Sequence, residues 1–152
     1  RQRTGRDHAG RVLGTVGEPD DADIPSFALA QDGRRIATSR TAQGNQDIWV
    51  IDVTRGVPSR FTFDGGNDNA PAWSADGRRV VFRSTRNGAY DLFHKPASGA
   101  GDEQPLLATP ESKIAYGSSA DGRYLQATQE VLQKHGALWF YDESYVISRR
   151  RD

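Results

Sequence analysis

The feature that most constrains the fold is a repeat of about 44 residues. Three glycines recur 44 and 45 residues apart, and three large aromatic residues recur 44 and 46 residues apart: Gly33, Gly77 and Gly122, and Trp49, Phe93 and Trp139. A period of about 40 to 45 residues made of short strands is typical of β-propellers, whose blades are four-stranded antiparallel sheets. Two independent landmarks give nearly the same period, so the sequence predicts an all-β partial propeller of about three to three and a half blades.

The central copy of the repeat, residues 71–93, contains three predicted strands and two tight turns. Asp76-Gly77 and Asn87-Gly88 mark the turns, because glycine readily adopts the positive φ that such hairpins need. By the same pattern, residues 1–152 form a single domain with three blades and an additional outer strand of a preceding or closing blade; the blades are residues 24–63, 70–108 and 114–148, and the additional strand is residues 12–17. Residues 1–10 are interpreted as a loop.

These motifs resemble the TolB-like, WD-like β-propeller repeat of bacteria. The resemblance covers residues 24–141 and rests on Ser-Ala-Asp-Gly-Arg-Arg before an apolar strand, then Ser-x-Arg-x-Gly, then Asp-Leu-Phe or Asp-Ile-Trp. The family typically has a proline in the first turn, where this chain has Gln31, Ala75 and Ala120. In the third copy, Ala137 replaces the aspartate that opens the third strand of the other two.

A narrower similarity involves three connecting segments, residues 10–21, 57–66 and 95–107. These segments are most similar to propellers on the extracytoplasmic side of bacterial receptor-type kinases and in related periplasmic proteins. The resemblance implies a noncatalytic, extracytoplasmic platform that binds a protein or peptide. The alternative is an accessory or gating propeller of a larger enzyme, such as a prolyl-oligopeptidase-like serine peptidase.

Composition excludes several classes of function. Twenty basic and twenty acidic residues give no net charge, so no bulk field attracts nucleic acid. Cysteine is absent, and no apolar run approaches the roughly 18 residues of a membrane span. The three histidines lack the spacing of a helical zinc motif, and the acidic segment 18–23 lacks the ligand order of a calcium loop. We therefore predict no catalytic, cofactor or metal site, no nucleic-acid partner and no membrane insertion.

The predicted partner-binding surface lies where two kinds of loop meet. In a propeller, the connections between blades and the turns between second and third strands emerge on the same face. Loops on a rigid scaffold commonly carry binding residues. The candidate residues on this face are Arg40, Asn45, Asp68, Asn69, Arg86 and Asn87.

Two recurring side chains are assigned structural roles. Trp49 lies in an apolar third strand and is predicted to be core. Asp47 and Asp91 recur at one position of the repeat, so each is predicted to bond the backbone or a nearby arginine, Arg40 or Arg86.

The number of blades raises a question of closure, because propellers typically close with about four to eight blades. Three explanations remain open: an excerpt of a larger propeller, two chains that complete one ring of about six blades, and an open array. The sequence starts at Arg1 and contains no methionine, which favours the excerpt, with a homo-oligomer second.

Overall fold

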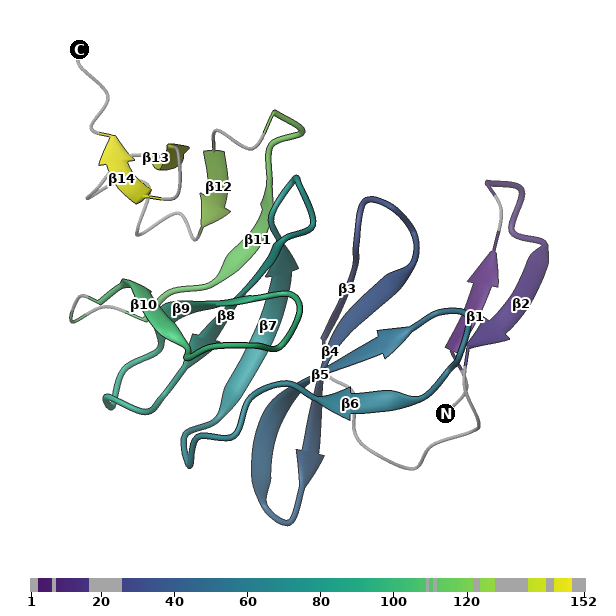
Figure 1. Ribbon diagram of the computed structural model, residues 1–152, viewed down its shortest axis with the longest axis horizontal. Coiled ribbons are helices and arrows are strands. Elements are labelled where there is room, and N and C mark those ends of the chain that lie inside the picture. Colours follow the sequence, from purple (N-terminus) through teal and green to yellow (C-terminus); the bar gives the residue numbers. More distant parts are fainter. Residues whose placement is uncertain are drawn as a thin grey trace.

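The computed structural model describes residues 3–6, 8–16, 26–108, 110, 112–121, 124–127, 137–141 and 144–148. The strands form three four-stranded antiparallel sheets and one two-stranded sheet (Figure 1). The first blade comprises β3 (Phe27–Leu29), β4 (Arg35–Ala42), β5 (Asn45–Asp52) and β6 (Pro58–Arg60); the second comprises β7 (Asp68–Trp73), β8 (Arg79–Ser84), β9 (Asp91–Pro96) and β10 (Gln104–Leu107). The third comprises β11 (Ala115–Ser118), β12 (Tyr124–Ala127), β13 (Ala137–Tyr141) and β14 (Ser144–Ser148). The predicted all-β partial propeller is confirmed.

The turns follow the glycine pattern of the sequence. Gly33 and Gly77 have φ values of 70° and 67°, and Gly88 has a φ of 103°. The β4–β5 hairpin is tighter than the sequence predicts, because Ala42 pairs with Asn45 and only two residues turn the chain. Both turn residues, Gln43 and Gly44, have positive φ, as a two-residue hairpin with the twist of its strands requires.

Apolar residues that alternate along the strands form two layers between the blades. The layer between the first two blades contains Ala30, Ala37, Ile48, Phe61, Trp73, Val80, Phe82 and Phe93. The layer between the second and third contains Ala72, Val81, Leu92, Leu107, Ala115 and Leu125. Polar bonds reinforce both junctions: Trp73 Nε1 donates to the Ala28 carbonyl at 3.0 Å, and Ser118 Oγ donates to the Trp73 carbonyl at 3.0 Å. The second blade is therefore fixed on both faces.

The N-terminal segment differs from its prediction as a loop. Residues Arg3–Arg6 form β1, which pairs with β2 (Val12–Val16) in a separate hairpin. The sequence does not predict this strand, because RTGR lacks the alternation of apolar residues that indicates a strand. The strand forms nevertheless, since antiparallel pairing uses only backbone groups. β2 covers residues 12–16 of the strand predicted at residues 12–17, and the strand paired with it lies immediately upstream.

The prediction that Trp49 is a core residue is wrong. Its side chain is half-buried rather than core, and the guanidinium of Arg40 lies 4.7 Å from its ring centroid. Trp49 is on the face of the first blade that turns away from the second, whereas Phe93, 44 residues later, is packed in a layer between blades. Gly122, the acidic segment 18–23 and the tail 149–151 lie outside the described residues. No helix in the described ranges is long and apolar enough to cross a membrane.

Candidate binding face

Three loop segments meet at one end of the first two blades. Asn45 Nδ2 donates to the Asp64 carbonyl at 3.0 Å, and the Gln46 amide donates to Asn67 Oδ1 at 3.1 Å. The Thr85 amide donates to the Asn67 carbonyl at 3.1 Å. We call this surface the loop face, defined by residues 43–46, 64–69 and 85–90. These bonds join segments of both blades into one surface.

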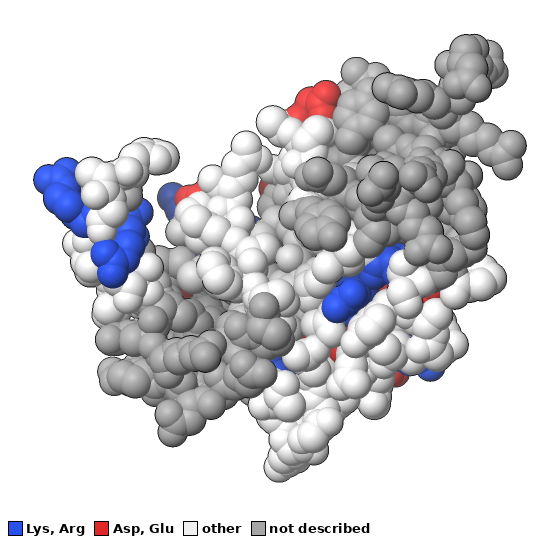
Figure 2. Space-filling model, turned by 180° about the vertical axis from the view of Figure 1, so that it is seen from behind, with Lys and Arg blue, Asp and Glu red and all other residues white. Residues whose placement is uncertain are grey.

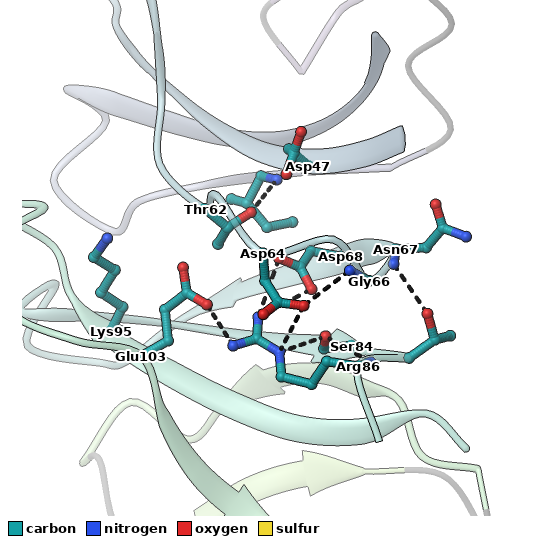
Figure 3. A network of polar contacts seen from close by, with 12 residues as sticks. Asp47, Thr62, Asp64, Gly66, Asn67, Asp68, Ser84, Arg86, Lys95 and Glu103 are labelled. Carbon is teal, nitrogen blue, oxygen red and sulfur yellow. Dashed lines mark hydrogen bonds and ion pairs between the residues drawn. The ribbon is translucent and has the colours of Figure 1, made fainter. Parts of the chain in front are cut away.

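Arg86 occupies the centre of a carboxylate cluster that joins segments of the loop face (Figure 3). Its Nη2 lies 3.2 Å from Asp68 Oδ1, its Nη1 lies 2.6 Å from Glu103 Oε2, and its Nε lies 3.8 Å from Asp64 Oδ1. Arg86 Nε also donates to Ser84 Oγ at 2.8 Å. The cluster therefore ties the connection between the blades to the β8–β9 turn and to the segment before β10.

Burial makes this cluster structural. The side chain of Arg86 is 15% exposed and that of Asp68 is fully buried. Burial raises the pKa of Asp68, and hydrogen bonds from Ser84 and Thr62 and the charge of Arg86 offset only part of that effect. Burial lowers the pKa of Arg86, but Glu103 and Asp68 outweigh it and the net pKa is above the usual value. The guanidinium also lies 4.2 Å from the Phe93 ring centroid. Arg86 is therefore a buried residue that holds the loops in place.

Gly66 allows the chain to pass close to Arg86. A Cβ atom at Gly66 would lie 2.7 Å from the Arg86 backbone nitrogen and 2.9 Å from its Cα. The Gly66 amide donates to Asp64 Oδ1 at 2.8 Å, which fixes the turn locally. Only glycine fits this approach without displacing backbone.

The other predicted residues of the face have different surroundings. Arg40 and Asn45 lie in strands, because β4 continues to Ala42 and β5 begins at Asn45. Asp68 and Asn69 begin β7 and are buried. Asn87 is exposed in the β8–β9 turn. The structure therefore brings Asp68 and Arg86 into contact and leaves Asn87 at the surface.

The recurring aspartates have partners that the sequence does not predict. Asp47 pairs with Arg60 of β6 at 2.7 Å, and Asp91 pairs with Lys113, which precedes β11, at 2.8 Å. Arg60 and Lys113, which the sequence analysis does not name as partners, thus form ion pairs with these two carboxylates. No group of three His, Cys, Asp or Glu side chains could hold a metal ion within the described ranges.

A further polar cluster was not predicted. Asn69 Nδ2 donates to Gln46 Oε1 at 2.6 Å and lies 3.3 Å from the Tyr90 hydroxyl, and Arg83 Nε donates to Asn69 Oδ1. The Arg83 guanidinium lies 4.2 Å from the Tyr90 ring centroid. One signal was available in the sequence, since Arg83 stands 44 residues after Ser39 and breaks the repeat at that position.

Comparisons with known proteins agree with this architecture. An uncharacterized protein of Agrobacterium fabrum is 33% identical over 84 residues, which cover 54% of this chain and 29% of that protein. The Tol-Pal system protein TolB of Desulfosudis oleivorans is 34% identical over 59 residues, which cover 39% of this chain and 14% of the relative. The chain thus spans less than a third of the length of either relative.

A solved structure and a family model also match this chain. The crystal structure of TolB from Acinetobacter baumannii has a TM-score of 0.65 at 20% identity, and the match covers 92% of this chain and 32% of that one. At that identity the likeness shows the fold alone. The family model of the TolB beta propeller domain matches residues 18–137, most of the sequence. The chain therefore belongs to the TolB β-propeller domain family.

Proposed function

We propose that the chain is a noncatalytic module that binds a protein or peptide partner through the loop face. The observation that carries this proposal is the set of hydrogen bonds that fixes three loop segments of two blades into one surface. A surface fixed before binding loses little conformational entropy when a partner docks. The buried Arg86 cluster supplies this rigidity, and the exposed Asn87 is available for contact.

The chemistry of the surface favours a protein partner over nucleic acid. Basic and acidic residues balance, and on the side seen in Figure 2 the basic residues of the described part lie in separate areas. Nucleic-acid binding depends on neutralising many phosphates with clustered Lys and Arg. One relative bears the name of a Tol-Pal system protein, and the resemblance noted in the sequence implies a role outside the cytoplasm. We therefore place the module in an extracytoplasmic protein assembly.

The experiment is a peptide selection followed by affinity measurement. A random peptide library displayed on phage is panned against the immobilised chain, and recovered peptides are synthesised and titrated by calorimetry. We expect Asn87→Arg, which places a long charged side chain on the loop face, to reduce affinity about tenfold or more, equivalent to at least about 1.4 kcal/mol. The peptides should remain intact by mass spectrometry after incubation with the chain.

Ala100→Arg supplies the matched control, because Ala100 is exposed in the β9–β10 turn. This turn lies at the opposite end of the blade, where the Ala97 amide bonds the Arg78 carbonyl. The control should bind as tightly as the unchanged chain. Failure to enrich any peptide, or equal binding by the Asn87→Arg variant, contradicts the proposal.

A further inference from the structure

Arg83 lies in β8 next to the loop face, and Asn69 and Tyr90 of that face hold its guanidinium in a fixed orientation. We propose that its guanidinium binds a carboxylate of a partner peptide, and that Asn69 and Tyr90 hold it ready for this contact. The proposal rests on the peptide-binding function proposed above, for which it names the chemical class of one anchoring group. It concerns a residue that the sequence pattern alone does not assign to the face.

Two contacts orient the guanidinium. Its Nε donates to Asn69 Oδ1, and its central carbon lies 4.2 Å from the Tyr90 ring centroid, so one edge and one face are occupied. Asn69 is itself fixed, because its Nδ2 bonds Gln46 Oε1 at 2.6 Å and is near the Tyr90 hydroxyl. Asn69 is 7% exposed, so this support is buried. The two terminal Nη groups are the donors that these contacts leave for a ligand.

The charges around Arg83 indicate that this cation is not used to stabilise the fold. Four carboxylates of the first two blades pair with other cations: Asp68 and Glu103 with Arg86, Asp47 with Arg60, and Asp91 with Lys113. Among the ion pairs between described residues, none uses Arg83. Partial burial of a guanidinium costs solvation free energy, and an ion pair with a carboxylate is the interaction that most strongly offsets this cost. Arg83 has no such ion pair among the described residues.

The internal repeat provides an independent argument. Position 83 corresponds to Ser39 in the first blade, where Ser39 Oγ bonds Ser26 Oγ at 2.7 Å. Position 90 corresponds to Gln46 by the same spacing of 44 residues. The first blade thus has a small, neutral, partly buried pair of serines at this place, whereas the second blade has an arginine stacked on a tyrosine. A departure from the repeat that adds a charge without an ion pair is the type of local exception expected at a functional position.

The geometry of the two Nη groups matches a carboxylate. A guanidinium presents paired N–H donors in a planar fork, to which a carboxylate binds with two parallel hydrogen bonds. Two sources of carboxylate exist in a peptide, the side chain of Glu or Asp and the C-terminus. We assign the side chain as the ligand, since a continuous surface such as the loop face suits a partner segment that passes across it.

The test observes Arg83 directly by NMR. The Nε–Hε signal of Arg83 is assigned from its absence in Arg83→Lys, and the chain is titrated with three probes: Ac-Gly-Glu-Gly-NH2, Ac-Gly-Gln-Gly-NH2 and Ac-Gly-Gly-Gly with a free C-terminus. We expect the Glu peptide to shift this signal saturably, with a dissociation constant of about 10 to 100 mM, because one charge-assisted contact contributes about 1.5–3 kcal/mol. The Gln peptide should leave it unchanged, and the free C-terminus should act more weakly than Glu.

Variants separate this contact from nonspecific attraction. Arg83→Lys keeps the charge but lacks the fork, so any peptide signals that report Glu binding should weaken at least about threefold. Arg55→Gln is the control, because Arg55 is exposed in the β5–β6 turn, at the end of the first blade opposite the loop face. This variant should bind the Glu peptide normally. Equal shifts with Glu and Gln peptides, a stronger response to the free C-terminus, or unaltered Glu binding by Arg83→Lys overturns the proposal.

Selected peptides distinguish this inference from the function on which it rests. If library peptides lose affinity for Asn87→Arg but bind Arg83→Gln as tightly as the unchanged chain, the carboxylate site is refuted and the loop face stands. If no peptide is selected but the Glu probe shifts Arg83 saturably, the carboxylate site stands and the broader binding function is refuted.

Discussion

The buried pair between Lys113 and Asp91 gives the sharpest prediction for stability. Lys113 is fully buried, the Asp91 side chain is 7% exposed, and the two charged atoms lie 2.8 Å apart. Lys113→Met keeps most of the side-chain volume but leaves the carboxylate of Asp91 buried without this cation. Removing one member of a buried ion pair typically costs about 3–5 kcal/mol, because the remaining charge stays desolvated. We expect a loss of that size in the free energy of unfolding.

The assay is equilibrium unfolding in urea followed by tryptophan fluorescence at neutral pH. The double variant Asp91→Asn/Lys113→Met removes both charges, and it should be more stable than Lys113→Met alone. A loss below about 1 kcal/mol in the single variant would mean that solvent reaches Asp91 and would refute the argument. Equal instability of the single and double variants would show that packing, rather than the orphaned charge, causes the effect.

Two further predictions concern pH and packing. Burial lowers the pKa of His94 from 6.5 to about 4, so the unfolded chain binds this proton first and stability should fall as pH decreases from about 6.5 to about 4. At 1.36 kcal/mol per pKa unit, the loss of unfolding free energy approaches about 3 kcal/mol. The variant His94→Gln, unfolded in urea at several pH values across this range, should not show this loss. If the unfolding free energies of the variant and the unchanged chain fall in parallel with pH, the assignment to His94 is wrong. Gly66→Ala would push a Cβ against the Arg86 backbone and should destabilise the chain by about 1–3 kcal/mol in urea unfolding. Gly65→Ala is the matched control, because a Cβ there meets nothing within 4 Å, and equal effects of the two variants would refute the steric argument.

The sequence predicts the blades well because their signals are local and repeated. Asp-Gly and Asn-Gly turns are specified by the φ that glycine permits, and Gly77 and Gly88 have positive φ as predicted. The strand at residues 79–84 has the predicted bounds, since β-branched residues and flanking turns define it from both sides. These turns and strands can be predicted without knowing how the neighbouring blades pack.

Contacts to the outer strands and between blades were not predictable in the same way. Asp47 and Asp91 share one position of the repeat, but Arg60 pairs with the first and Lys113 with the second. The choice depends on where the outer strand and the next blade place their side chains, and the connections that set this differ in length. Trp49 and Phe93 likewise differ in burial although they share a position, because a neighbouring blade covers one of them and the other lies under Arg40.

The repeat is nevertheless informative about function when it is read for its exceptions. Residues that serve the fold should recur, because each blade solves the same packing problem, as Gly33 and Gly77 do in their turns. Arg83 does not recur: a bonded serine pair occupies its place in the first blade. A chain under selection for folding alone would favour the neutral solution in both blades, since it avoids the cost of partly desolvating a charge. The exception is therefore best explained by a ligand, and a carboxylate is the group that the stacked guanidinium is shaped to receive.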